Sequence, residues 1–289
     1  MKKITCKNTD DNYEITVGYT DFNPFFLVSC DGIYTADFDV STSANTMTDG
    51  STYQGTIAKM REIVLTVAME SDYVQNRNLL YKVFRKGAAG EFIYTEDSEV
   101  RRIAYRAANV DIDETGVVRN AAITLKCPDP FFEDLSDMRV DMAGWEKLWI
   151  FPHAFQLEPF GQRKEEKLKD IDNEANADNV GMTITFTAEG DVTNPAIYHV
   201  QEKEYIKVGT ASKPLNMVEG DVLTITTQTN NKNVRLLHDG VSTLINEYLD
   251  NGSEFIQLQS GKNSLRYTAD AGEDYLAVSI SYRNRYIGV

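Results

Sequence analysis

Cysteine is scarce in this sequence of 289 residues, which contains three: Cys6, Cys30 and Cys127. They are odd in number, far apart and at no zinc or redox spacing, so a disulfide scaffold is excluded and synthesis in a reducing compartment is indicated. We expect Cys30 and Cys127 to be small buried residues. Long apolar runs are also missing, since no stretch approaches the ~20 residues of a membrane-spanning helix. The first residues carry Lys2 and Lys3 with no apolar segment behind them, so we expect no secretory signal.

Positive charge is in deficit as well. Lys and Arg number 29 against 44 Asp and Glu, which gives a formal net charge of −15. Such a surface repels phosphate backbones and anionic lipid, although it suits a pore through which nucleic acid passes without sticking. With 42% hydrophobic and 10% aromatic residues the chain can build a sizeable core. Its length favours one large β domain or two domains of ordinary size.

Catalytic and metal-binding patterns are absent from the sequence. Its three histidines, His153, His199 and His238, have no partner at a motif spacing, so we expect each to be structural or on the surface. Residues 111–116 begin like a calcium loop, but the twelfth position holds Ala122 where a bidentate Glu is needed, so we interpret them as a turn. No phosphate-binding loop, dinucleotide fingerprint or nucleophile elbow occurs. We therefore predict no catalytic, cofactor-binding or metal-binding residues, no cofactor, and a protein that is not an enzyme.

Alternation of apolar and polar residues predicts strands in the first third of the chain. Residues 13–19 and 57–69 alternate at period two, as half-buried strands require. Their apolar faces consist of Tyr13, Ile15, Val17 and Tyr19 in the first segment and of Ile63, Leu65, Val67 and Met69 in the second. Arg61 shares the register of the second face, at the end where this strand is expected to emerge. Residues 41–55 are small and polar, which predicts a long exposed loop.

Residues 71–86 have the pattern of a helix. Ser71 or Asp72 can cap its start, Arg85 and Lys86 suit its last turn, and Gly87 can end it. Its predicted stripe consists of Tyr73, Arg77, Leu79, Leu80, Val83 and Phe84. Further strands are expected at 91–95, 101–112 and 117–127, the last two joined by a hairpin turn at 113–116. Two prolines within residues 127–132 end this block.

The middle of the chain differs in composition. Trp145, Trp149, Phe151 and Phe155 form an aromatic-rich patch. It has two interpretations: packing in a core or between domains, which we favour, or a platform on which sugar rings stack. The mixed-charge run at residues 163–170 predicts a solvated loop or hairpin tip.

The last part of the chain predicts strand after strand. Alternating segments lie at residues 182–187, 205–208, 222–227, 234–237, 264–267 and 275–282, and turn residues separate them. Short strands with turns at this spacing are typical of an antiparallel sandwich or jelly roll. The fold class is therefore mainly β, with one helix in the first domain.

Several fragments, in their order along the chain, resemble one protein family. In the first domain they are residues 49–53, 61–65, the helix after that strand, and 127–132, with the sequence Cys-Pro-Asp-Pro-Phe-Phe. In the second domain they are residues 194–197, 220–225, 253–255, 261–263 and 280–289, together with Leu258. The chain resembles the distal tail proteins of long-tailed, non-contractile bacteriophages, which form a hexameric hub between tail tube and tip.

The resemblance implies a domain organisation. Residues 1–134 would be a ring-forming, tail-tube-like β domain with one α-helix. Residues 135–289 would form a galectin-like antiparallel β-sandwich, with residues 135–178 including a connecting segment and loop. The length leaves no room for a large inserted carbohydrate module.

The resemblance also implies a function, that of a structural component of the tail tip or baseplate in the virion, assembled in the host cytoplasm. Its expected partners are five further copies of itself, the tail tube protein, a tail-associated tip protein and a receptor-binding protein. DNA would pass through the ring without specific binding, and no membrane would be involved. Residues 41–55 and 57–69 are the candidate ring contacts, because tube-like rings use such hairpins between subunits.

Two other functions compete with the hub. A carbohydrate-binding module for host attachment is the runner-up, motivated by the aromatic patch that contains Trp145 and Trp149. A hydrolase acting on cell-wall polymer ranks third, because it rests only on abundant carboxylates, and catalytic pairs cannot be recognised from composition.

Overall fold

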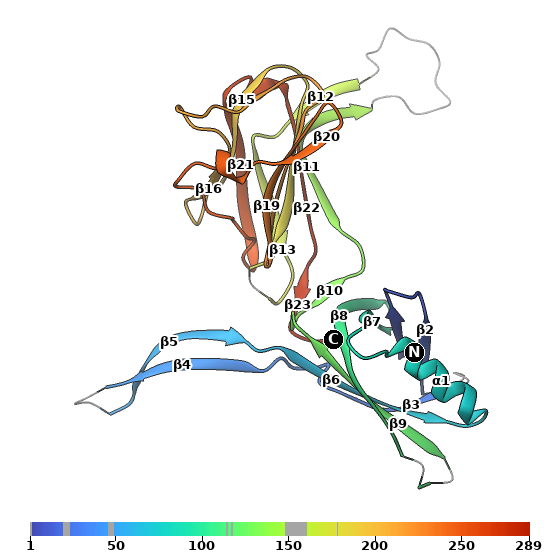
Figure 1. Cartoon of the computed structure of the whole chain (residues 1–289). Coiled ribbons are helices and arrows are strands. Elements are labelled where there is room, and N and C mark those ends of the chain that lie inside the picture. Colours follow the sequence, from blue (N-terminus) through green and yellow to red (C-terminus); the bar gives the residue numbers. More distant parts are fainter. Residues whose placement is uncertain are drawn as a thin grey trace. The chain divides into compact units, whose positions relative to one another are not determined.

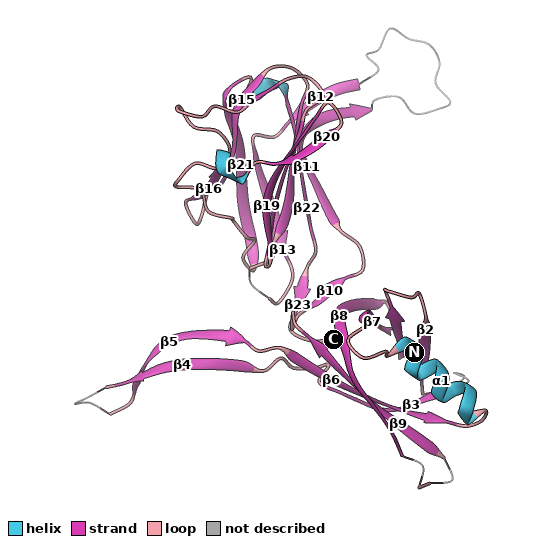
Figure 2. Cartoon of the chain, in the orientation of Figure 1, coloured by secondary structure: helices cyan, strands magenta, loops and turns pink. Residues whose placement is uncertain are grey.

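The structure is a computed structural model in which the chain divides into two compact units. The described residues are 2–19, 24–45, 49–113, 115–116, 118–147, 161–177 and 179–289. The first unit comprises Met1–Leu135 together with Arg285–Val289, and the second comprises Ser136–Asn284. Both units consist mainly of strands, and the described residues include one α-helix (Figures 1 and 2). None of the described helical segments is long and apolar enough to cross a bilayer.

Nine strands of the first unit form one sheet, in the order β23-β10-β8-β7-β1-β2-β3-β6-β9. They are β1 (Lys3–Asn8), β2 (Glu14–Gly18), β3 (Phe25–Asp31), β6 (Arg61–Met69), β7 (Ala89–Glu96), β8 (Glu99–Asp113), β9 (Arg119–Cys127), β10 (Phe132–Asp134) and β23 (Arg285–Tyr286). The long strand β8 pairs with β7 through its first half and with β9 through its second half, which closes the sheet into a barrel-like structure. Neighbouring strands are antiparallel except for β2 and β3.

The barrel core confirms part of the predicted alternation, although the strand predicted at residues 57–69 is divided between one that ends at Ala58 and β6, which begins at Arg61. Ile63, Leu65, Val67 and Met69 of β6 are all buried, as are Ile15 and Val17 of β2. Tyr13 and Tyr19, which were predicted to share the face of Ile15 and Val17, lie outside β2 and are exposed, so that part of the prediction was wrong. The burial pattern of a strand follows from its pleat, which sends successive side chains to opposite faces.

Helix α1 (Tyr73–Val83) lies within the predicted segment, and Leu80, Val83 and Phe84 of its predicted stripe are buried. Asp72 is the N-cap residue, in a left-handed conformation and without a side-chain capping bond. The side chain of Asn76 donates instead to the carbonyl of Ser71, at 2.5 Å. The helix ends at Val83, so the prediction that Arg85 and Lys86 lie in its last turn was wrong.

Strands β4 (Phe38–Ala44) and β5 (Ser51–Ala58) pair with each other and form a separate two-stranded sheet (Figure 1). The prediction of a loop at residues 41–55 was therefore wrong. Few of these residues are apolar, and the pairing is made by backbone hydrogen bonds between the adjacent strands, which composition does not reveal. Cross-strand side-chain bonds add to the pairing, such as that from Gln54 to Ser43 at 2.9 Å.

The second unit contains a seven-stranded sheet, in the order β12-β11-β22-β14-β18-β19-β20, and a sheet with the order β13-β21-β15-β16 that β17 joins at β15. The first consists of β11 (Met138–Lys147), β12 (Gly161–Glu165), β14 (Met182–Ala188), β18 (Val222–Gln228), β19 (Asn231–His238), β20 (Val241–Leu244) and β22 (Leu276–Tyr282). The second consists of β13 (Leu168–Asn173), β15 (Val192–His199), β16 (Glu204–Lys207), β17 (Asn216–Met217) and β21 (Gly261–Ala271). Two single-turn 3₁₀ segments, η1 (Asn246–Tyr248) and η2 (Glu273–Tyr275), complete this unit.

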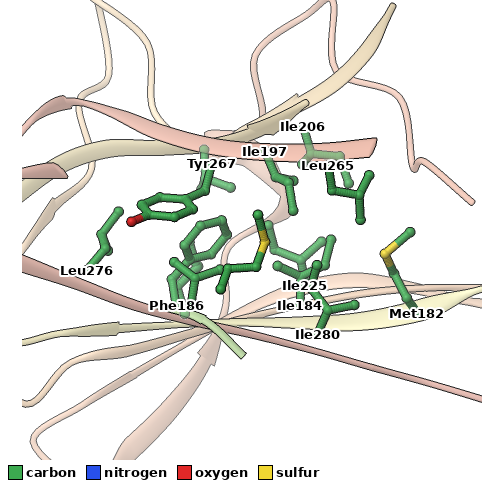
Figure 3. Packing of buried hydrophobic residues seen from close by; sticks show 14 of the residues in the cluster. Met182, Ile184, Phe186, Ile197, Ile206, Ile225, Leu265, Tyr267, Leu276 and Ile280 are labelled. Carbon is green, nitrogen blue, oxygen red and sulfur yellow. The ribbon is translucent and has the colours of Figure 1, made fainter. Parts of the chain in front are cut away.

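The two sheets of this unit enclose one hydrophobic core, as the predicted sandwich requires. Figure 3 shows side chains from both sheets meeting, with Phe186 and Ile280 from the larger sheet and Ile197 and Tyr267 from the smaller one. All four residues are at most 1% exposed.

The mixed-charge run at residues 163–170 is not a loop or a hairpin tip, so that prediction was wrong. It covers the end of β12 and the start of β13, which pair in different sheets. The run therefore carries the chain from one sheet of the sandwich to the other. Lys167, in the link, pairs with Glu273 at 2.9 Å.

Candidate functional site

The two histidines that the structure describes form hydrogen bonds within the second unit. His199 is buried; its Nδ1 accepts from the backbone N–H of Glu202 at 3.2 Å, so its Nε2 donates to the side-chain oxygen of Asn263 at 2.9 Å. His238 lies 2.7 Å from a carboxylate oxygen of the buried Asp221, and this hydrogen bond raises the pKa of the imidazole above 6.5. His153 lies outside the described residues.

No cluster of three or more His, Cys, Asp or Glu residues in the described part of the chain could hold a metal ion. The segment that begins like a calcium loop starts within β8, whose last residue, Asp113, accepts from the backbone N–H and the hydroxyl of Thr115. Cys127 is buried and Cys30 partly buried, and burial raises the pKa of each thiol to about 12. Both thiols are therefore protonated and weakly reactive at neutral pH.

The β4–β5 ribbon is the most exposed regular element of the first unit, since every described residue of it is exposed or partly exposed. In the described structure neither strand pairs with a third one, so each has an open edge. Open edges present unpaired backbone donors and acceptors and are places where another chain can add. A single two-stranded ribbon is also marginally stable in water by itself.

The ribbon has one apolar face. Phe38 lies opposite Ala58, Val40 opposite Thr56, and Thr42 opposite Tyr53. Alternation along β4 places Phe38, Val40 and Thr42 on one side, and a register shift at Gln54 brings Tyr53 to the same side as Thr56. The hydrogen bond from the Tyr53 hydroxyl to Thr56, at 2.9 Å, is consistent with this assignment. Phe38, Val40 and Tyr53 are 44%, 55% and 63% exposed, respectively. Large apolar side chains gathered on an exposed surface indicate an interaction site.

The other face of the ribbon is mostly polar. Asp39, Ser41, Ser43 and Gln54 lie there, with Ile57 as an exposed apolar exception. Asp39 pairs with Lys59 at the base of the ribbon, at 3.6 Å. The sequence signal for this amphipathic hairpin was the alternation that begins at Phe38 and Val40, followed by the Asp49-Gly50 turn.

Arg61, where β6 begins after the ribbon, does not emerge into solvent as predicted: its residue is 3% exposed. Its guanidinium donates to the carbonyls of Gly32 at 2.6 Å, Thr35 at 3.0 Å and Pro130 at 2.6 Å, and also to that of Ile287. Burial lowers its pKa, although an arginine stays charged at neutral pH. Arg61 thus ties two loops, residues 32–37 and 128–131, and the C-terminal segment to the base of the ribbon.

The predicted aromatic patch lies largely outside the described residues, which exclude Trp149, Phe151 and Phe155 and the side chain of Trp145. The backbone of Trp145 belongs to β11 and pairs with Arg163 of β12.

Family models match both units of the chain. A phage tail protein RIFT-related domain matches residues 14–127, and the C-terminal domain of a siphovirus-type tail component matches residues 177–286. This chain belongs to the siphophage distal tail proteins. It is accordingly a structural component of a phage tail, and such components are parts of the virion. No curated protein matches the sequence.

The fold of this distal tail protein agrees with two solved structures. The hub protein SPP1 Dit (gp 19.1), from a phage that infects Gram-positive bacteria, aligns over 98% of both chains with a TM-score of 0.69 and 12% identity. A chain of the phage P2 baseplate, in its activated conformation with Ca, aligns over 100% of both chains with a TM-score of 0.53 and 9% identity. At these identities the agreement concerns the fold alone.

Proposed function

We propose that this distal tail protein is a non-enzymatic hub, six copies of which close into a ring between the tail tube and the tail tip. The observation that carries the proposal is the β4–β5 ribbon, whose apolar face and open edges lack a partner strand in the described part of the chain. Identical subunits that contact head to tail form closed rings when the rotation between them closes. The ribbon and the adjoining strand β6 are the proposed contacts.

The ring surrounds the DNA channel, and its other partners are the tail tube protein, a tail-associated tip protein and a receptor-binding protein. The net charge of −15 supports this role, because an acidic lining repels the phosphate backbone and lets DNA pass without specific binding. Assembly takes place in the host cytoplasm and the hub resides at the tail tip of the virion.

The test compares two aspartate substitutions on opposite faces of the ribbon. Val40→Asp places a charge on the apolar face, and Ser43→Asp places the same charge on the polar face. Both residues are exposed and neither belongs to a core, so both variants should keep the thermal stability of the parent chain. Native mass spectrometry and negative-stain microscopy at moderate salt measure assembly, in the presence and absence of the tail tube protein.

The parent chain and Ser43→Asp should give six-fold rings, and Val40→Asp should remain monomeric. A parent chain that stays monomeric at high concentration, even with the tube protein, would contradict the ring. If Val40→Asp forms rings as well as the parent chain does, the apolar face of the ribbon is not part of the interface.

A further inference from the structure

An amide, a carboxylate and an ammonium meet on three neighbouring strands of the smaller sheet in the second unit. Asn194 belongs to β15, Lys207 is the last residue of β16, and Asp270 lies near the end of β21. Strand β15 lies between the other two strands, and its register with β21 places Asn194 opposite Asp270. The three side chains therefore come together although 76 residues separate Asn194 from Asp270.

The carboxylate of Asp270 joins the other two groups. One of its oxygens, Oδ2, accepts from the side-chain N–H₂ of Asn194 at 2.9 Å and from the ammonium of Lys207 at 2.9 Å. The other oxygen, Oδ1, accepts from the same ammonium at 2.7 Å. A single oxygen atom thus separates the amide nitrogen from the ammonium nitrogen, and the flexible four-carbon stem of a lysine allows the ammonium to approach the amide carbon.

The amide of Asn194 is held in one orientation. Its oxygen accepts from the backbone N–H of Leu215 at 2.8 Å, and its nitrogen donates to Asp270. Because a backbone N–H only donates and a carboxylate only accepts, these partners fix which end of the amide is the oxygen. Asn194 is 4% exposed, and a Cβ added to Gly209 would lie 1.9 Å from the amide oxygen, so the group is closely packed.

The backbone at Asn194 is strained. Its φ of 51° is left-handed, and it directly precedes Pro195, whose ring restricts the residue before it to extended conformations. Strain of this kind is concentrated at functional sites. The conformation keeps the side chain of Asn194 between Leu215 and Asp270.

We propose that Lys207 and Asn194 become joined by an isopeptide bond, with Asp270 as the proton carrier. Lys207 passes a proton to Asp270, and its neutral Nζ attacks Cγ of Asn194. The N–H of Leu215 stabilises the negative charge that develops on Oδ1. Asp270 then gives its proton to Nδ2.

The reaction balances without an oxidant, a reductant or a cofactor. The bond from Cγ to Nδ2 breaks, the bond from Cγ to Nζ forms, and Nδ2 leaves as ammonia. Of the three protons on the ammonium of Lys207, one remains on the new amide, one leaves with the ammonia and one is released to water. Hydrogen bonds from Lys207 and Asn194 lower the pKa of Asp270 below 3.8, so the first proton transfer is uphill and the reaction is slow. The departure of ammonia makes it irreversible in dilute solution.

The bond would secure the edge of the smaller sheet. In the described structure β16 is an edge strand, paired along its length with β15 alone. Edge strands open more easily than central ones, and a covalent bond to the neighbouring strand prevents this. The inference does not depend on the proposed ring, because all of its residues belong to the second unit.

The test is the intact mass of the denatured full chain, measured directly after purification and again after prolonged storage at neutral pH. The parent chain should become lighter than its sequence by about 17 Da, the mass of the ammonia that is lost. Peptide mapping should then give a branched tryptic peptide that contains both Asn194 and Lys207, because trypsin does not cleave after a lysine whose amine is acylated.

Lys207→Arg and Asp270→Asn are the test variants, and both should keep their full mass. Arginine retains the positive charge, but its guanidinium stays protonated and is not a nucleophile at neutral pH. Asparagine at position 270 cannot carry the proton. Lys262→Arg is the matched control, since Lys262 forms an exposed ion pair with Asp170 in the same sheet, at 2.8 Å, and this variant should lose the same mass as the parent chain.

A stored parent chain that keeps its full mass would overturn the proposal, and this measurement requires no variant to fold. A mass loss that persists in Lys207→Arg would overturn it as well. Such a loss would arise from a cyclic imide at another asparagine, for example Asn251, which precedes Gly252 in a turn.

Discussion

Replacing Arg61 with alanine should destabilise the first unit more than the replacement of any exposed arginine. The guanidinium forms four hydrogen bonds to backbone carbonyls, and the ring of Phe132 lies 4.9 Å from its central carbon. A hydrogen bond to a charged group contributes about 1.5–3 kcal/mol, so four of them amount to roughly 6–12 kcal/mol before offsets. Rehydration of the carbonyls and relief of the buried charge offset part of this. We expect a net loss of about 3–5 kcal/mol in the free energy of unfolding of the first unit.

Hydrogen exchange with peptide-level mass spectrometry is the appropriate assay, because a chain with two units need not unfold in a single step. Protection should fall in β6, in β10 and in residues 285–289, and peptides of the second unit serve as an internal reference. Arg85→Ala is the control, since the Arg85 side chain is 59% exposed and its ion pair with Asp11 is worth about 1 kcal/mol at most. A loss for Arg61→Ala that is no larger than that for Arg85→Ala would refute the assignment of Arg61 as the tie between these loops.

Two further substitutions test the local geometry. In urea unfolding, Gly32→Ala should lower the free energy of unfolding by about 2 kcal/mol more than Gly87→Ala does. Both glycines have positive φ, but only at Gly32 would the added Cβ meet a backbone carbonyl, that of Glu62 at 2.1 Å. Equal losses of stability in the two variants would contradict this. The pKa of His238, measured by NMR, should lie above 6.5 in the parent chain and return towards that value in Asp221→Asn. A pKa at or below 6.5 in the parent chain would contradict the hydrogen bond between His238 and Asp221. Because the folded-state pKa is the higher one, the stabilisation from protonated His238 is full below pH 6.5 and is lost as the pH rises through the raised pKa.

The strands that the sequence predicted best are those with one strictly apolar face. In β6, four alternating apolar residues are all buried, because a register error of one residue would expose the whole set. The strands of the sandwich follow the same rule, and Met182, Ile184 and Phe186 of β14 are fully buried. For these segments local periodicity carries the same information as the three-dimensional packing.

The ribbon and Arg61 were predicted wrongly for a common reason: what stabilises them is not visible in local hydrophobicity. The ribbon is held by backbone pairing between two weakly apolar strands. Arg61 is buried because carbonyls from residues 32, 35, 130 and 287 converge on it, and a sequence does not reveal which distant loops meet. The return of residues 285–289 to the first unit is a long-range pairing of the same kind.

A polar cavity of about 370 Å³ in the second unit could not have been predicted from spacing either. Its walls come from residues 204, 232 and 253–259, and no motif joins them. Buried Ile256 and Leu258 imply that Gln257, which lies between them, faces outwards, so part of one wall follows from alternation. The other walls depend on how the strands of the two sheets are ordered.

The exposed area on the ribbon limits how strong one contact between copies can be. Full burial of an aromatic or branched side chain contributes about 1.5–3 kcal/mol. Phe38, Val40 and Tyr53 are already about half buried, so roughly 3 kcal/mol remains to be gained from the three together. Association costs about 4 kcal/mol or more in lost freedom, so these side chains alone do not hold a dimer.

A closed ring makes association more favourable than a dimer does, because each subunit gains two contacts. The last contact forms between subunits of the same assembly, so it does not cost the freedom of another subunit. Each copy carries a net charge of −15, so the copies repel one another at low salt. This repulsion destabilises the partial assemblies as well as the closed ring. The proposed ring therefore predicts assembly that is all or none, in which monomers and closed rings coexist. A series of stable dimers and trimers in native mass spectra would show that the contact is stronger than these side chains allow, and that the interface lies elsewhere.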